Sequence, residues 1–151
     1  MRAFRFIPRA LFTLALTAWT AFTVGAASGA SYTVNVASAT VEGKSAQILS
    51  DADGFALYYL TSDSLASPAC TGGCLKAWPP LLSSTSPTAS PSLPGKLTVV
   101  HTANGSQVSY SGHLLYRYAG DTKPGQVNGN DVAGPKGGQW LPKRSDRPAR
   151  A

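Results

Sequence analysis

Apolar and polar residues follow short strand-like patterns in the second half of the chain. Residues 97–101 form a β-branched run, and residues 107–110 and 113–118 continue as two further apolar segments. Asn104-Gly105 and Ser111-Gly112 separate them, and Asn-Gly is a strong hairpin signal because both central residues of a tight turn must tolerate positive φ. The pattern predicts three antiparallel strands with two turns.

The first half of the chain shows a shorter version of this pattern. Residues 46–50 and 55–60 are strand-like and flank Asp53-Gly54, and residues 32–36 suggest an additional strand before them. Alternation with a period of two places Phe55, Leu57 and Tyr59 on one face and Ala56, Tyr58 and Leu60 on the other. Both faces are apolar, so we expect the sheet to be covered on both sides in a sandwich- or barrel-like all-β domain.

The two halves also correspond residue by residue. Shifting the sequence by 58 residues aligns a set of identical residues, which pairs Gly54 with Gly112, Leu57 with Leu115, Tyr58 with Tyr116 and Asp63 with Asp121; Trp78 and Trp140 also correspond if the second copy has four extra residues. We interpret residues of about 46–82 and 97–141 as two homologous β units. Because a small isolated sheet is only marginally stable, we expect both units to pack as one domain over residues 31–142. The Ser/Pro-rich residues 83–94 would form a long exposed loop between them.

The first 30 residues have the composition of a secretory signal peptide. Three arginines precede the apolar residues 10–25, and small residues follow at 26–30. Cleavage after Ala27 and cleavage after Ala30 fit equally well. The apolar segment is shorter than the roughly 20 residues that span a bilayer, although an uncleaved anchor remains the alternative. We therefore expect a secreted or periplasmic protein without stable membrane insertion after cleavage.

The formal net charge of +6 comes from the two ends of the chain. Three bases lie in the first ten residues, and residues 143–151 contain four bases and one acid. The intervening part has six bases and six acids, and the bases are scattered singly. Because a nucleic-acid-binding domain concentrates its basic residues on one surface, we expect no nucleic-acid partner. Residues 143–151 are expected to form a basic disordered tail.

Cys70 and Cys74 are the only cysteines. In an exported protein such a pair is expected to form a disulfide, and Gly72 and Gly73 would let the chain curl into a small loop. The alternative is a soft metal site, since both thiolates could bind Cu(I) together with His101, or a thiol-redox site. Attachment of haem is excluded because Leu75, and not histidine, follows the second cysteine.

One motif in both copies resembles that of a known family. The second copy contains Tyr116, Tyr118 and Asp121 in a Y-x-(F/W/Y)-x-x-D arrangement, while the first copy has Leu60 at the position of the second aromatic residue. Together with the C-x-x-x-C and Trp-Pro-Pro segments, this resembles the bacterial secreted-repeat lipoproteins, a family largely without known function. The cysteine that would carry a lipid is absent near the cleavage region, so this chain is expected to be freely soluble.

The motif residues allow two interpretations. The full set is Gly54, Tyr58, Asp63, Trp78, Gly112, Tyr116, Tyr118, Asp121 and Trp140. They are structural if the carboxylates accept backbone N–H groups in turns and the rings fill the core. They bind a ligand if the aromatic members line a pocket for a sugar or another flat molecule.

The sequence offers little support for catalysis. It has two scattered histidines and no Gly-x-Ser-x-Gly nucleophile turn, so we expect neither an enzyme nor a cofactor. The expected function is an exported binding or envelope-associated structural module, with an unknown envelope component or small molecule as partner. The alternative function is a periplasmic thiol-redox or copper protein that uses Cys70 and Cys74.

Overall fold

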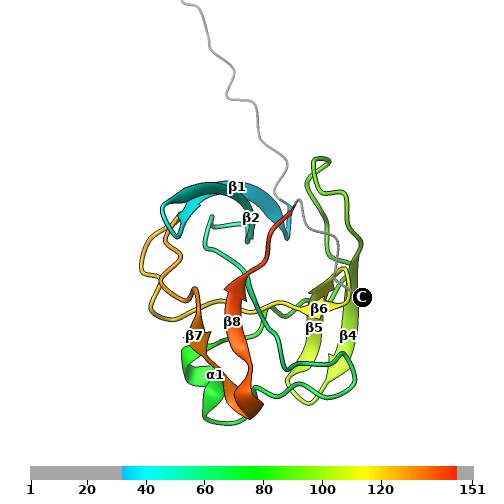
Figure 1. Cartoon of the computed structure of the whole chain (residues 1–151). Helices are drawn as coiled ribbons and strands as arrows, with labels where there is room; N and C mark the ends of the chain where they lie inside the picture. Colours follow the sequence, from blue (N-terminus) through cyan, green and yellow to red (C-terminus); the bar gives the residue numbers. More distant parts are fainter. Residues whose placement is uncertain (1–31, 146–151) are drawn as a thin grey trace, which may run out of the picture.

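The computed structural model describes residues 32–145 and contains almost only β-structure (Figure 1). The predicted signal peptide with its cleavage site lies outside these residues, as does the chain from residue 146 onward. Eight strands are present: β1 (Asn35–Val41), β2 (Lys44–Ser50), β3 (Tyr58–Leu60), β4 (Leu97–Thr102), β5 (Gly105–Tyr110), β6 (His113–Leu114), β7 (Val132–Ala133) and β8 (Gln139–Pro142). The short helix α1 (Cys74–Ala77) and the 3-10 turn η1 (Pro135–Gly137) complete the fold. The all-β prediction is confirmed.

The strands form three small antiparallel sheets. Their orders are β1-β2, β3-β8-β7 and β4-β5-β6, and within the described residues they do not close into a barrel. In Figure 1 the β1–β2 hairpin lies at the top of the molecule and the β4–β6 sheet on the right. The predicted alternation holds, because Ala56, Tyr58 and Leu60 belong to one apolar cluster and Leu57 to the other.

Several strand boundaries differ from the prediction. The first strand is not 32–36 but β1, which pairs with β2 through a turn at Glu42-Gly43, where both residues have positive φ. Prediction missed this turn because glutamate rarely adopts positive φ. The β4–β5 turn is centred on Ala103-Asn104, since Thr102 pairs with Gly105. The third predicted strand, 113–118, is reduced to β6 and single bridges at Tyr116.

The two copies correspond in their backbone hydrogen bonds as well as in sequence. Leu57 N–H donates to Leu49 O at 2.9 Å, and Leu115 N–H donates to Val108 O at 3.0 Å. Leu57 is therefore equivalent to Leu115, and Leu49 is equivalent to Val108. The β1–β2 hairpin of the first copy thus occupies the place of the β4–β5 hairpin, so the first copy begins near Asn35 and not at residue 46.

Each copy donates its last segment to the other copy. Leu81 of the first copy donates to Leu115 O at 2.9 Å and accepts from Val108 N–H at 2.8 Å. Lys143 of the second copy makes the equivalent bonds, to Leu57 O at 2.8 Å and from Leu49 N–H at 2.7 Å. Neither copy completes its hydrogen bonding alone, which explains why they form one domain.

This exchange also changes the expected tail and loop. Lys143 to Ser145 belong to the fold, because Ser145 N–H donates to Gln47 O at 3.1 Å; we had assigned them to the disordered tail. The Ser/Pro-rich loop is partly exposed, as expected, but it is attached to the fold: Val34 N–H donates to Thr88 O at 3.1 Å and Ser90 N–H to Val34 O at 3.0 Å. Polar composition alone did not reveal these bonds.

Candidate functional site

The tyrosines of the motif bind the aspartates of the opposite copy. Tyr58 donates its hydroxyl hydrogen bond to Asp121 Oδ2 at 2.7 Å, and Tyr116 donates to Asp63 Oδ2 at 2.7 Å. The two tyrosines also face each other across an antiparallel bridge, with N–H···O distances of 2.8 and 2.9 Å. The four residues thus form a reciprocal, pseudo-two-fold lock between the copies, which we call the Tyr–Asp lock.

The remaining carboxylate oxygens of the lock fix local loops. Asp63 Oδ1 accepts Ala69 N–H at 2.6 Å, and Asp121 Oδ1 accepts Asn128 N–H at 2.9 Å. Burial raises the pKa of both tyrosines, and the hydrogen bond to the carboxylate raises it further. Both hydroxyls therefore remain protonated and act as donors at neutral pH.

The other motif residues pack in the same region. Trp78 and Trp140 stack with ring centroids 3.9 Å apart and an interplanar angle of 6°, and Tyr118 stacks on Trp78 at 4.4 Å. Tyr58 and Tyr116 each contact one tryptophan edge-on. The proposed ligand-lining rings are thus brought together, but they contact one another, and Trp140 is fully buried.

The two motif glycines occupy equivalent turns. Gly54 has a φ of 86° and Gly112 a φ of 82°, a left-handed conformation that glycine adopts without steric cost. Their conservation between the copies is therefore explained by backbone geometry.

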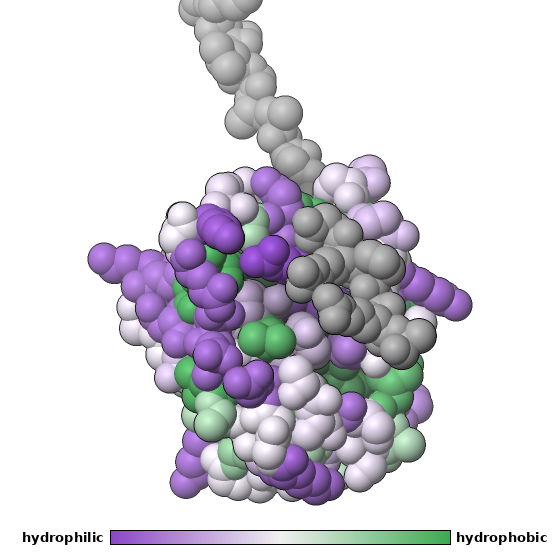
Figure 2. Space-filling model, in the orientation of Figure 1, coloured by the Kyte–Doolittle hydropathy of each residue, from purple (hydrophilic) through white to green (hydrophobic). Residues whose placement is uncertain are grey.

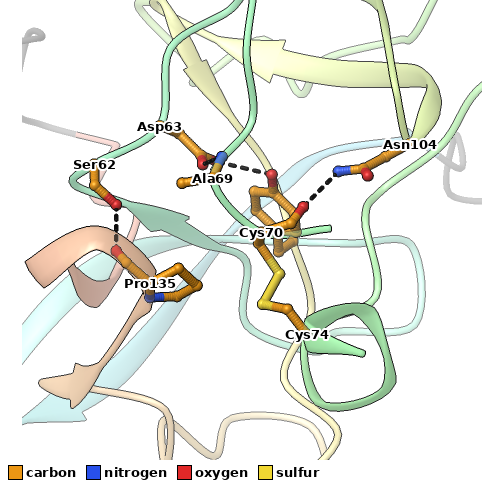
Figure 3. The surroundings of a disulfide bond; sticks show 8 residues. Ser62, Asp63, Ala69, Cys70, Cys74, Asn104 and Pro135 are labelled. Atoms are coloured by element: carbon orange, nitrogen blue, oxygen red, sulfur yellow. Dashed lines mark hydrogen bonds between the residues drawn. A yellow bond between two sulfur atoms is a disulfide. The ribbon is translucent and has the colours of Figure 1, made fainter. Parts of the chain in front are cut away.

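Cys70 and Cys74 form the predicted disulfide, with a Cα–Cα distance of 5.4 Å. Figure 3 shows how this loop is held: Asp63 binds Ala69 beside it, and Asn104 from the second copy donates to Cys70 O at 3.0 Å. His101 lies elsewhere, with its Nδ1 3.2 Å from the Ser106 hydroxyl. Within residues 32–145 no group of three His, Cys, Asp or Glu side chains is placed to hold a metal ion.

The structure shows a pair of sites that sequence reasoning missed. Arg117 forms ion pairs with Asp51 and Asp53, and its guanidinium lies 5.1 Å from the Phe55 ring centroid. An open cavity of about 300 Å³ adjoins Asp51 and Arg117. The 58-residue offset already pairs Arg117 with Tyr59 and Phe55 with His113, and these unlike residues were the available signal that the copies had diverged here.

The equivalent site in the other half is built around Lys143. Its Nζ lies 5.1 Å from the Tyr59 ring centroid and 5.8 Å from that of Tyr110, and Tyr59 also contacts the His113 ring at 4.5 Å. Burial lowers the pKa of Lys143. Burial also lowers the pKa of His113, and the positive charge of Lys143 adds to this effect.

A second open cavity, of about 340 Å³, lies between the Ser/Pro-rich loop and β4, where Leu97, Val99 and His101 line it. Large apolar side chains are otherwise rarely exposed in the described part of the chain, with Leu65 and Leu82 as the examples. Figure 2 accordingly shows apolar residues reaching this face of the molecule in small separate patches. None of the helices in residues 32–145 is long and apolar enough to cross a membrane.

The fold and the lock define a two-copy β-protein with an internally exchanged strand. Residues 98–142 match a family described as a secreted repeat of unknown function. This segment contains β4 to β8 and belongs to that family, which confirms the resemblance seen in the motif. No curated protein and no solved structure shows significant similarity to the chain.

Proposed function

We propose that the protein is an exported, non-catalytic module that acts as a binding or structural component of the cell envelope. In this proposal the Tyr–Asp lock holds the two copies together and does not contact a ligand. The observation that carries this assignment is the reciprocity of the lock: both hydroxyls donate to carboxylates of the opposite copy at 2.7 Å.

The chemistry of the motif supports a non-catalytic role. A general base needs a carboxylate or imidazole within reach of a substrate proton, whereas Asp121 is 7% exposed and accepts two internal hydrogen bonds. The rings that could stack on a flat ligand stack on each other instead. A binding role therefore has to rely on other surfaces.

Three features support export. The first 30 residues have the order of a signal peptide, the family is described as secreted, and the cysteines form a disulfide, a bond typical of oxidising compartments. A periplasmic or fully secreted location is consistent with all three.

N-terminal sequencing and fractionation test this proposal. We expect the protein in the periplasmic or culture fraction with Ser28 or Ser31 as its first residue, and a pull-down from envelope extract to recover a specific component. A protein that retains Met1 and stays in the cytoplasm would overturn it. The lock is tested separately with Asp121→Asn, which should lower the melting temperature while the protein is still exported and retains its envelope partner.

A further inference from the structure

The equivalence of the two copies pairs the surroundings of Leu81 with those of Lys143. Both residues make the same backbone bonds to the opposite copy, Leu81 to Leu115 and Val108, and Lys143 to Leu57 and Leu49. Their side chains therefore project from equivalent positions. What one side chain contacts can be compared directly with what surrounds the other.

In the second copy the lysine side chain fills its site. Lys143 is only 4% exposed, and its ammonium group lies over the faces of Tyr59 and Tyr110, a favourable placement for a cation. The site therefore accommodates an aliphatic chain that ends in an amine.

In the first copy the same position holds a shorter, uncharged side chain. Leu81 is one of the residues that line the open cavity of about 300 Å³, together with Tyr32, Thr33, Asp51, Ala52 and Arg117. Asp51 follows Leu49 and Ser50 as Tyr110 follows Val108 and Ser109, so a carboxylate stands where the lysine site has a tyrosine ring. The cavity thus combines space at the place of the lysine chain with an acidic group at its end.

The charges at the cavity are unbalanced towards the negative. Two carboxylates, Asp51 and Asp53, share the single guanidinium of Arg117. Asp51 is 3% exposed, and although Arg117 Nε is its ionic partner, Asp51 Oδ2 receives no hydrogen bond in acceptable geometry. Since buried carboxylate oxygens are normally hydrogen-bonded, Oδ2 has capacity for a further donor.

We propose that this cavity binds an alkylammonium group, which takes the place that the Lys143 side chain occupies in the equivalent site. The amine would donate to Asp51 Oδ2, and its aliphatic chain would lie against Leu81 and Tyr32. A free alkylamine and a lysine side chain of a polypeptide share this chemistry. The inference rests on the binding role proposed above and gives it a ligand class.

Amide NMR of the full mature chain, titrated with n-butylammonium, tests the inference. We expect chemical-shift changes at residues 32–33, 51–55, 81 and 117, with millimolar affinity because the probe has few atoms. Pentanoate and 1-pentanol have similar chains with a negative or no charge, and both should leave these residues unchanged. Equal binding of pentanoate, or no localised change with butylammonium, would overturn the inference.

Two variants and one control make the test specific. Leu81→Lys should fill the cavity with the chain's own amine and weaken butylammonium binding at least about tenfold. Asp51→Asn should have a similar effect while its remaining oxygen still accepts the N–H groups of Asp53 and Phe55, now at 2.9 and 3.0 Å. Leu82→Lys adds the same charge one residue away, on a side chain that is 51% exposed, and should leave binding unchanged. A folded Leu81→Lys protein with unaltered affinity would overturn the inference.

A second series of probes identifies the source of the amine. Tighter binding of a lysine-containing tripeptide than of butylammonium would support a polypeptide ligand, and equal binding would support a free amine. If no amine binds but the protein is exported with a cleaved N-terminus, the ligand inference fails while the proposed export and lock remain supported.

Discussion

Removing the Tyr58 hydroxyl tests the Tyr–Asp lock most directly. Tyr58→Phe keeps the buried ring and its contact with Trp78 but removes the donor to Asp121 Oδ2. It also removes the acceptor of Gly129 N–H, which lies 3.3 Å from the hydroxyl. Asp121 is 7% exposed, so water has little access to replace the lost partner.

The expected loss of stability follows from these contacts. A hydrogen bond to a charged group contributes about 1.5–3 kcal/mol, so we expect Tyr58→Phe to lower the free energy of unfolding by about 2–3 kcal/mol. For a domain of this size that corresponds to a decrease of about 8–12 °C in Tm. Tyr116→Phe should cost less, about 1–2 kcal/mol, because its partner Asp63 is only partly buried.

Double-mutant cycles in urea then show which aspartate each tyrosine binds. We expect a coupling energy of about 1–2 kcal/mol between Tyr58→Phe and Asp121→Asn. The cycle of Tyr58→Phe with Asp63→Asn, the aspartate of the same copy, should give a coupling near zero. The disulfide must stay oxidised in all variants so that the unfolded states remain comparable.

Two results would refute this reasoning. The reciprocal lock is wrong if Tyr58 couples more strongly to Asp63 than to Asp121, because the motif would then act within one copy. It is also wrong if both phenylalanine variants lose less than about 0.5 kcal/mol, the range of ordinary surface substitutions.

Three further substitutions have defined expectations. Replacing Cys70 and Cys74 by serine should lower stability in urea by about 2 kcal/mol, the loop-entropy value for so small a ring, and an unchanged midpoint would contradict this. Gly129→Ala should lose about 1–3 kcal/mol because an added Cβ would lie 2.7 Å from the Trp78 ring, whereas Gly73→Ala, with nothing within 4 Å, is the matched control and should not destabilise. His113→Phe tests pH dependence: burial lowers the pKa of His113, so the unfolded chain takes up the proton first as pH falls through about 6.5, and the native state loses stability there. Thermal melts between about pH 7.5 and 5.5 should therefore show a smaller fall in Tm for His113→Phe than for the unchanged chain, and equal falls would refute the assignment.

The sequence alone determined the β-class, the duplication and the disulfide. Period-two alternation assigned Leu57 and Tyr58 to opposite faces because side chains of a strand alternate whatever the sheet packs against. The repeated Gly54 and Gly112 marked equivalent turns because their backbone conformation is a local property. The Cys70–Cys74 pairing needed no long-range information, since the two residues are separated by three others.

Only the tertiary structure decided how the copies combine. Nothing local to Leu81 or Lys143 indicates that each pairs with the opposite copy, because a strand's pattern specifies which face is buried and not which neighbour it joins. The partners of the tyrosines were equally hidden: Tyr58 lies five residues from Asp63 but binds Asp121, because the strand directs its side chain across the pseudo-two-fold axis. The cavity beside Asp51 arises from the same exchange, since Leu81 reaches it only as the strand contributed to the other copy.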